Sequence, residues 1–419
     1  MSLLRSPVRK GSTPVASNRP AFLPFALPDI GEAEIEAVVA VLRSGWITTG
    51  PETKAFEREF AEHLGVAHAV AINSCTAALH LALEALGVKE GDEVLTSTVT
   101  FTATAEVAEY LGARSRLVDV DRATLNLTPD GARAMIEREY VRRSGAWRHR
   151  QTGGRLRALV PIHYGGHPCD LPGLLALAAE YELRVVDDAA HALTAALGGR
   201  WIGAFGCPTA FSFYPTKPMT TAEGGMLVTD DAAVADRVRV MALHGINHDA
   251  WQRYAAQGSW VYEVVDAGYK YNLTDIAAAL GRVQLRRLDA MHARREAIAA
   301  RYTRGLAALP EIEAPEAQPG IRHAWHLYPI RLRLDQLIID RAAVIRELHD
   351  RQVGTSVHFI PLHRQPFYAG RYGYRRDDFP VAEAEYPRLI SLPIYSRMSD
   401  ADVDAVVDAV ADVVHHFRA

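Results

Sequence analysis

The stretch Thr209–Asp231, TAFSFYPTKPMTTAEGGMLVTDD, places a lysine between two apolar runs. Lysine is rare in this chain: only five of its 46 basic residues are lysines, Lys10, Lys54, Lys89, Lys217 and Lys270. Unlike arginine, a lysine amine can lose its proton and become a nucleophile or form a Schiff base. A single lysine after a strand is more often a solvated surface residue, so a catalytic role for Lys217 needs support from the rest of the chain.

The two runs around Lys217, TAFSFYP and GGMLVTD, predict strands joined by a short Gly-containing connection, which favours an antiparallel pair. Upstream, strand-like runs such as HAVAINS, DEVLTST, RLRALVPIHYGG and RVVDDAA alternate with helical runs such as CTAALHLALEALGV, FTATAEVAEYLGA and LPGLLALAAEYEL. This alternation predicts an α/β fold with a mostly parallel central sheet flanked by helices.

A long helical pattern, RVQLRRLDAMHARREAIAARYTRGLAAL, is suited to link two domains. After it, the runs HAWHLYPIRL and GTSVHFIPLH predict strands, and DRAAVIRELHDRQV and DADVDAVVDAVADVVHHF predict helices. The polar stretch YVRRSGAWRHRQTGG predicts a surface insertion. The expected organisation is a flexible arm over residues 1–20, a large α/β domain over 21–270, a linking helix over 271–310 and a smaller α+β C-terminal domain over 311–419.

Composition narrows the class of protein. The chain has 419 residues, 49% of them hydrophobic and 23% charged, as in ordinary globular proteins. A net charge of -4 gives no reason to expect nucleic-acid or membrane-surface binding, and no apolar run has the length needed to span a bilayer. Three cysteines without a C-x-x-C pair argue against a disulfide framework, so we expect a cytoplasmic protein.

Two turns after strands carry residues that suit a phosphorylated cofactor. In NSCTAAL a strand gives way to a helix at Cys75 and Thr76, where a helix N-terminus and a hydroxyl can bind phosphate, although most such turns are ordinary helix caps. The second turn carries Phe101, whose ring could stack on a planar cofactor or could simply belong to the core. Each signal is weak when taken alone.

The run VVDDAAH places two carboxylates at the C-terminal end of a buried strand, where α/β sheets bind ligands. Because neighbouring strand residues point to opposite faces, only one of Asp187 and Asp188 can enter a cleft. A carboxylate there can hold a ring nitrogen protonated, and His191 could bond to a nearby ring oxygen. A helix cap with a structural histidine is the alternative interpretation.

The order of these features is more specific than any one of them. A phosphate-binding turn, an aromatic residue, an Asp-x-x-His motif and Ser212 five residues before Lys217 together resemble the fold-type I pyridoxal-phosphate (PLP) enzymes. More narrowly, GWITTGP, DDAAHA, SFYPTKPMTTAEGG, GYKYNLTDI and SLPIY are similar to motifs of the DegT/DnrJ/EryC1/StrS family of sugar aminotransferases. The resemblance extends over nearly the whole chain.

The resemblance implies PLP as cofactor and assigns residues to it. Lys217 would carry the Schiff base and move protons, Asp188 would bind the ring nitrogen, and Asp187 would be structural. Phe101 would stack on the ring, and His191 would lie beside the ring hydroxyl. The phosphate would contact Cys75, Thr76, Ser212 and, from the partner subunit of a homodimer with shared active sites, a residue equivalent to Asn272.

The resemblance also implies a reaction. L-glutamate would leave its amine on the cofactor, and a nucleotide-linked keto sugar would collect it, with C4 as the expected position. A 3-keto sugar or a cyclitol ketone stays possible as the acceptor. Candidate substrate contacts are Trp46, Lys270, His326, His358 and His363, each of which could equally have a structural role.

Three other functions fit the sequence less well. The first is a PLP-dependent sugar dehydratase or lyase: some members of this family are dehydratases that carry His in place of the lysine, whereas this chain has Lys217. A PLP-binding regulator would need an added DNA-binding helix-turn-helix, for which the proline-rich first 30 residues are too short. In HYGGHPCD, the residues His163, His167, Cys169 and Asp170 match no usual zinc spacing, so we expect no metal.

Overall fold

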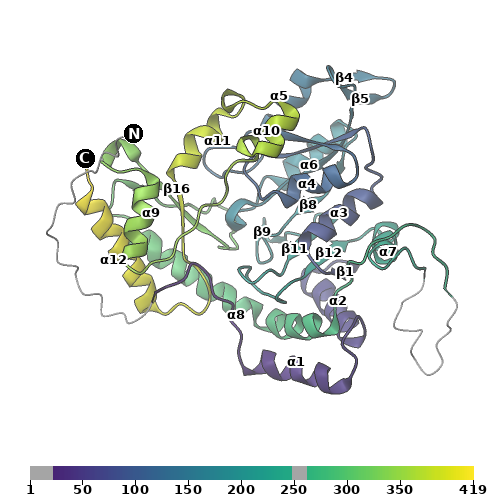
Figure 1. Ribbon diagram of the computed structural model, residues 1–419, viewed down its shortest axis with the longest axis horizontal. Helices are drawn as coiled ribbons and strands as arrows, with labels where there is room; N and C mark the ends of the chain where they lie inside the picture. Colours follow the sequence, from purple (N-terminus) through teal and green to yellow (C-terminus); the bar gives the residue numbers. More distant parts are fainter. Residues whose placement is uncertain (1–21, 248–261) are drawn as a thin grey trace, which may run out of the picture.

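The computed structural model describes residues 22–247 and 262–419, so the arm expected over residues 1–20 lies outside the described residues. Its centre is a sheet in two parts (Figure 1). The first part has the order β3-β2-β6-β5-β4 with β7 beside β6, and the second has the order β1-β12-β11-β8. Only Val186 separates β7 from β8, and a parallel bridge between Ile162 and Asp188 joins the two parts.

The strands alternate with helices as the sequence patterns predict. The strands are β1 (His68–Ile72), β2 (Asp92–Ser97), β3 (Arg114–Val118), β6 (Arg155–Val160), β7 (Arg184–Val185), β8 (Asp187–Asp188), β11 (Thr209–Ser212) and β12 (Gly225–Thr229). Pairings β2/β3, β2/β6, β6/β7 and β8/β11 are parallel, whereas β12 pairs antiparallel with both β1 and β11. The antiparallel pair predicted around Lys217 is therefore confirmed.

Helices cover the sheet on both faces, and apolar side chains fill the spaces between them. The helices of this part are α1 (Glu32–Ser44), α2 (Pro51–Leu64), α3 (Cys75–Ala85), α4 (Ala103–Tyr110), α5 (Pro129–Glu139), α6 (Leu171–Glu180) and α7 (Ala232–Met241). One core contains Phe56, Phe60, Phe211 and Phe213, and a second contains Ile72, Leu79, Leu81 and Leu83. Burial of this apolar surface is the main force that holds the helices on the sheet.

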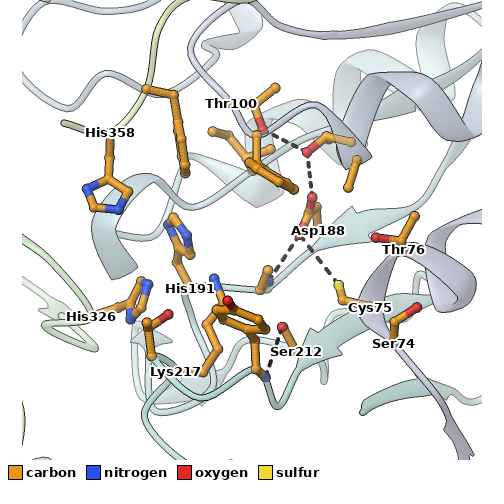
Figure 2. Close-up of a pocket in the computed structure, with 18 of the residues that line it drawn as sticks. Ser74, Cys75, Thr76, Thr100, Asp188, His191, Ser212, Lys217, His326 and His358 are labelled. Carbon is orange, nitrogen blue, oxygen red and sulfur yellow. Dashed lines mark hydrogen bonds between the residues drawn. The ribbon is translucent and has the colours of Figure 1, made fainter. Parts of the chain in front are cut away.

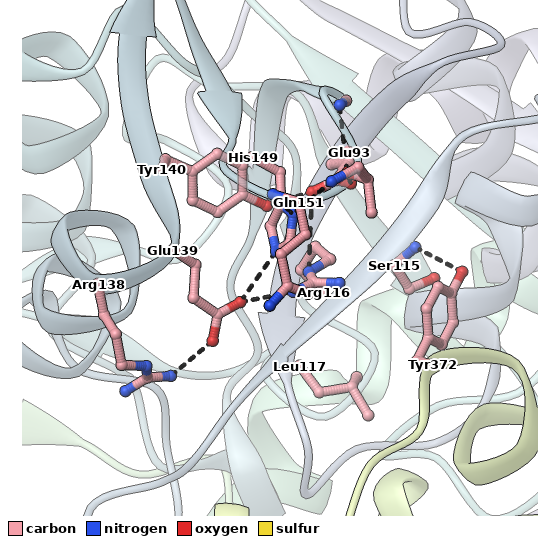
Figure 3. A network of polar contacts seen from close by, with 12 residues as sticks. Glu93, Ser115, Arg116, Leu117, Arg138, Glu139, Tyr140, His149, Gln151 and Tyr372 are labelled. Atoms are coloured by element: carbon pink, nitrogen blue, oxygen red, sulfur yellow. Dashed lines mark hydrogen bonds and ion pairs between the residues drawn. The ribbon is translucent and has the colours of Figure 1, made fainter.

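The polar stretch after α5 is a β-hairpin of β4 (Tyr140–Arg143) and β5 (Ala146–His149) at the edge of the sheet. A polar network attaches it (Figure 3). The Glu93 carboxylate, which is fully buried, accepts hydrogen bonds from Tyr140 Oη at 2.5 Å and from Thr152 Oγ1 at 2.7 Å. Arg116 lies 3.7 Å from Glu93 and 2.5 Å from Glu139, so the buried charges are paired.

The C-terminal part has its own core around β13 (Ile312–Glu313), β15 (Tyr328–Leu332) and β16 (Leu389–Leu392). Its helices are α9 (Arg341–Asp350), α10 (Pro366–Tyr372), α11 (Pro380–Glu385) and α12 (Asp400–His416). A small sheet of β9 (Ala196–Leu197), β10 (Arg200–Trp201) and β14 (Ile321–Arg322) joins it to the first part. The division of the chain at residues 270 and 310 stays a prediction.

Helix α8 (Asp275–Leu306) runs along both parts (Figure 1). Leu285 and Leu288 pack in the first core, whereas Ile298 and Tyr302 pack in the C-terminal core. The helix begins earlier than its apolar periodicity indicates, because Thr274 caps it by accepting a hydrogen bond from Ala277 N–H.

One secondary-structure prediction is wrong. The run GTSVHFIPLH does not form a strand: it makes one bridge, between Ser356 and Ser391, and ends in a short 3-10 helix, Leu362–Arg364. Its backbone groups find other partners, since Tyr164 Oη donates to the His358 carbonyl and Leu362 N–H donates to the Thr98 carbonyl. This segment forms part of a cavity wall instead.

Candidate active site

A cavity of about 500 Å³ lies where several strands end, between the sheet and the C-terminal segment 356–359 (Figure 2). Most of the site residues predicted from the sequence line it. From the prediction these are Cys75, Thr76, Phe101, Asp188, His191, Ser212, Lys217, His326 and His358. The volume is that of an ordinary small-molecule site.

Lys217 follows β11 in a tight turn in which its backbone N–H donates to the Tyr214 carbonyl at 2.9 Å. Its amine points into the cavity near His191 and His326 (Figure 2). Removal from water lowers the pKa of Lys217 to about 8, although the nearby Cys75 and Asp188 act in the opposite direction. Near neutral pH a useful fraction of this amine is therefore uncharged and nucleophilic.

Asp188 ends β8 with its carboxylate in the cavity and is 7% exposed. Oδ2 accepts a hydrogen bond from Thr104 Oγ1 at 2.7 Å, and Oδ1 accepts one from Ala190 N–H at 3.1 Å. The Cys75 thiol lies 4.0 Å from Oδ1. Burial raises the pKa of Asp188, and the hydrogen bonds from Thr104 and Ala190 oppose that rise.

Asp187 points to the other face of the strand, as the alternation of strand side chains predicts. It is fully buried, and its Oδ1 lies 2.9 Å from His163 Nε2. His163 Nδ1 accepts a hydrogen bond from Cys169 N–H at 3.1 Å, so both ring nitrogens have partners within the protein. Within residues 22–247 and 262–419, no three His, Cys, Asp or Glu side chains gather as they would around a metal ion.

Three imidazoles occupy the wall next to Lys217. The ring centroids of His191 and His326 lie 4.3 Å apart, and His358 Nδ1 lies 2.9 Å from Ser391 Oγ. Burial and the nearby Lys217 lower the pKa of His191 well below its usual value, and burial lowers that of His358 to about 4. His191 Nδ1 accepts a hydrogen bond from Gly165 N–H at 3.3 Å, so its proton is on Nε2.

The N-terminus of α3 faces another part of the cavity. Ser74 caps this helix by accepting a hydrogen bond from Ala77 N–H at 3.1 Å, and Thr76 and Ser212 place hydroxyls nearby (Figure 2). A helix N-terminus carries N–H groups without intrahelical acceptors and a positive partial charge, which together favour an anion. A Cβ on Gly225 would lie 2.5 Å from the Ser74 carbonyl carbon, so only glycine lets β12 pass this close to the turn.

Phe101 leaves 58% of its surface exposed although it lines the cavity. Its ring centroid lies 5.9 Å from that of Phe359, whose ring in turn stacks 5.8 Å from His191. An exposed ring beside a cavity offers a face on which a planar ligand can stack.

Three predicted residues, Trp46, Lys270 and Asn272, lie together with Thr49 outside the lining of this cavity. Lys270 Nζ donates to Asn272 Oδ1 at 2.5 Å, Asn272 Nδ2 donates to Thr49 Oγ1 at 2.7 Å, and Trp46 Nε1 donates to the Thr49 carbonyl at 3.2 Å. We call Trp46, Thr49, Lys270 and Asn272 the Thr49 cluster. It lies beside the end of β1, where Asn272 forms a bridge with Ile72.

His363 is also outside the cavity lining, and its environment is structural. The side chain is 2% exposed and stacks on Phe379 with ring centroids 4.3 Å apart. Its Nδ1 lies 2.7 Å from Thr98 Oγ1 and its Nε2 lies 2.7 Å from Glu383 Oε1. Neither nitrogen is therefore available to a substrate.

The sequence patterns did not single out several lining residues. These are Phe25, Ser74, Thr100, Thr104, Tyr214, Glu223 and Phe359. Ser74 could have been found as the residue before a helix, which is where capping side chains occur. The others carry no local signal, because chain segments far apart in the sequence bring them to the cavity.

Comparison with known proteins decides the family. The profile of the DegT/DnrJ/EryC1/StrS aminotransferase family matches residues 28–411. The chain belongs to this family. This aminotransferase is 46% identical over 401 residues to the spore coat polysaccharide biosynthesis protein SpsC of Bacillus subtilis, covering 96% of this chain and 99% of SpsC.

Solved structures agree with the assignment. The aminotransferase TlmJ from Streptoalloteichus hindustanus superposes with a TM-score of 0.83 at 34% identity, covering 94% of this chain and 100% of TlmJ. Spr1654 from Streptococcus pneumoniae, described as a sugar aminotransferase, superposes in its PLP form with a TM-score of 0.83 at 31% identity, covering 94% of this chain and 99% of Spr1654. The expected fold-type I architecture is thereby confirmed.

This aminotransferase is a PLP-dependent transaminase. The side chains of the cavity fit that cofactor chemically. They supply an amine of lowered pKa for an aldehyde, a buried carboxylate for a ring nitrogen and a helix N-terminus for a phosphate. No helix within residues 22–247 and 262–419 has both the length and the apolar character that crossing a membrane requires.

Proposed function

We propose that this aminotransferase moves an amino group from L-glutamate to the C4 keto group of a nucleotide-linked keto-deoxy sugar. The main support is the cavity that holds the Lys217 amine and the Asp188 carboxylate together, with uncharged imidazoles beside them. A sugar acceptor is consistent with SpsC, which is named for polysaccharide biosynthesis.

PLP supplies an electron sink for negative charge at the carbon that carries the amine. We assign Lys217 to the Schiff-base link, and the free Lys217 amine to proton transfer at the substrate carbon. Asp188 would pair with the ring nitrogen, and His191 would donate from Nε2 to the ring hydroxyl oxygen. The remaining assigned contacts are Phe101 with the ring face and Cys75, Thr76 and Ser212 with the phosphate.

We assign the substrates to the side of the cavity lined by His326 and His358. Burial lowers the pKa of both, so each ring is neutral and carries one N–H donor and one acceptor. In His358 the Nδ1 atom already lies 2.9 Å from Ser391 Oγ, which leaves Nε2 for a hydroxyl or carboxylate group of a substrate. His326 Nδ1 is buried and has no hydrogen-bond partner among the described residues.

We further propose a homodimer with shared active sites. The Thr49 cluster holds Asn272 and the two candidate substrate residues Trp46 and Lys270 outside the cavity lining of their own chain. Apolar side chains are exposed nearby on and after α1, where Ile35, Leu42 and Ile47 are 48%, 54% and 49% exposed. If a second copy of the chain covered these apolar side chains, the Thr49 cluster of the first copy could lie at the phosphate-binding turn of the second.

Visible absorbance tests the first half of the proposal. L-glutamate should bleach the visible band of the PLP-bound enzyme and yield 2-oxoglutarate, and Lys217→Ala should lack that band and the turnover. UDP- and dTDP-linked 4-keto sugars should then restore the band, and NMR of the product should place the new amine at C4. A band that glutamate leaves unchanged would refute glutamate as the donor.

The site of amination has its own alternatives. Restoration of the band by a 3-keto sugar or a cyclitol ketone, and not by 4-keto sugars, would overturn the C4 assignment. Release of a dehydrated sugar without an amine would support a dehydratase or lyase instead.

Subunit mixing tests the shared site. Lys217→Ala and Asn272→Ala are each expected to impair activity, and mixed dimers should regain part of it, because one of their two sites would carry neither change. Sedimentation should give twice the chain mass. A monomer, or mixtures that recover nothing, would contradict the proposal. The cytoplasmic location expected from the sequence stays a prediction.

A further inference from the structure

Two buried hydroxyls lead from the start of α4 to the Asp188 carboxylate (Figure 2). Thr104 Oγ1 lies 2.7 Å from Asp188 Oδ2, and Thr100 Oγ1 lies 2.7 Å from Thr104 Oγ1. Thr100 is 3% exposed and Thr104 is 1% exposed, so water contributes little to either hydrogen bond. In such surroundings each polar contact has a larger effect than at the surface.

The hydrogen bonds in this line have one consistent direction. An ionised carboxylate can only accept, so the Thr104 hydroxyl donates its proton to Asp188 Oδ2. The Thr104 oxygen can then accept a hydrogen bond from the Thr100 hydroxyl. The other carboxylate oxygen, Oδ1, is held by Ala190 N–H at 3.1 Å, so both oxygens have a fixed donor. The two bonds together restrict rotation of the carboxylate.

The ordinary role of threonine at the start of a helix does not account for this line. The residue before α4 is Thr102, which makes no side-chain capping bond, and the Thr104 hydroxyl is directed to Asp188 instead of the helix backbone. Burial raises the pKa of Asp188, and the hydrogen bond from Thr104 is the largest effect that lowers it. Thr104 therefore favours the charged form of the carboxylate.

We propose that Thr104, oriented by Thr100, is a positioning residue that keeps the Asp188 carboxylate ionised and turned toward the ring nitrogen of PLP. The inference rests on the proposed role of Asp188. Thr104 acts through that carboxylate, and Thr100 acts through Thr104.

The first test is Thr104→Val, which is nearly isosteric but removes the donor. Affinity for PLP should fall about tenfold, as expected for the loss of a hydrogen bond to a buried charge. The pH midpoint of the visible band should rise by about one unit, because a weaker positive charge on the ring raises the pKa of the nearby Schiff-base nitrogen. Thr104→Ser should restore both values.

The second test distinguishes an effect of the hydrogen bonds from Thr100 through Thr104 to Asp188 from an effect of local side-chain packing. Thr100→Val should shift both values in the same direction but by less, and should add nothing in the Thr104→Val background. Thr102→Val is the matched control, since the Thr102 hydroxyl contacts Glu106 and Tyr368 instead. It should leave both values unchanged.

Several results would overturn the proposal. Thr104→Val could match the wild type in both readouts, or Thr104→Ser could fail to rescue it, which would indicate packing alone. If Thr100→Val still changed either value in the Thr104→Val background, Thr100 would not act through Thr104, and that part of the proposal would be refuted. Asp188→Asn tests the underlying assumption: unchanged affinity and midpoint in this variant would refute the role of Asp188. A band that glutamate leaves unchanged in every variant and in the wild type would instead refute only the proposed donor.

Discussion

At the scale of single residues, the site depends on charges that are kept out of water. The Lys217 amine is desolvated in the cavity, and the neighbouring imidazoles of His191, His326 and His358 are neutral because burial lowers the pKa of each. The cavity therefore concentrates hydrogen-bond donors and acceptors with little permanent positive charge.

Capture of PLP by the apoenzyme should accelerate as the pH rises through about 8, the lowered pKa of Lys217. Below that pH the group is an ammonium without a lone pair, and above it the group is a nucleophilic amine. Rapid-mixing absorbance would measure the rate of PLP capture across a pH range that includes both this lowered pKa and the ordinary lysine pKa. A midpoint at the ordinary lysine value would mean that the cavity does not desolvate Lys217.

The two histidines of SVHFIPLH should respond differently to the same substitution. His358→Asn is expected to reduce turnover by about a hundredfold, because its ring faces the cavity. His363→Asn should instead lower the free energy of unfolding by about 1–3 kcal/mol, because Thr98 and Glu383 lose a buried partner. Steady-state kinetics and thermal unfolding of both variants would distinguish these roles, and a reversed pattern would contradict the placement of His363.

At the scale of elements, the start of α3 and strand β12 act as one unit. Gly225 lies in β12 opposite Ser212, and its missing side chain lets β12 approach the backbone of Ser74 and Cys75. The residues with the two predicted phosphate hydroxyls, Thr76 and Ser212, adjoin this contact and line the cavity.

Gly225→Ala should weaken PLP binding and lower stability by about 1–3 kcal/mol, since a Cβ would lie 2.5 Å from the Ser74 carbonyl carbon. Gly370→Ala, in α10, is a suitable control, because a Cβ there meets no atom within 4 Å. Equilibrium titration with PLP and thermal unfolding would compare the two. Equal behaviour of both variants would show that the turn can move without cost.

The elements were largely predictable from the sequence, because strand and helix periods are local properties. Helix α3 begins at the start of the run CTAALHLALEALGV, and the pair β11/β12 forms, as their patterns predict. The run GTSVHFIPLH was mistaken for a strand because its composition is strand-like, while its backbone partners, Tyr164 Oη and Thr98 O, lie far away in the sequence. For the same reason Thr100 and Thr104 could not be recognised as neighbours of Asp188.

At the scale of the whole molecule, α8 contributes side chains to two cores and thereby connects the walls of the cavity. Its Arg295 is buried and donates to the Ile394 carbonyl at 2.7 Å and the Trp325 carbonyl at 3.2 Å. Trp325 precedes His326, so this contact helps to set the position of an imidazole in the cavity.

The reactivity of the three cysteine thiols tests where the fold places each of them. Cys169 and Cys207 are buried in the first core, whereas Cys75 is buried but lines the cavity. A thiol reagent should modify Cys75 slowly in the apoenzyme, none of the three when PLP is bound, and all three after unfolding. Counting modified thiols by absorbance would check this, and fast reaction of a second thiol in the folded enzyme would contradict the core placement.

Asp187 and Asp188 have identical side chains and differ only in their position along β8, where neighbouring residues point to opposite faces of the sheet. The parallel register of β8 with β11, Asp187 opposite Thr209 and Asp188 opposite Ala210, sends the first to His163 and the second to the cavity. A shift of β8 by one residue in this register would turn each carboxylate to the opposite face of the sheet, although the composition of the chain would be unchanged. Which carboxylate meets the ligand is thus decided by counting residues along the strand, and an odd insertion in this segment would be more damaging than an even one.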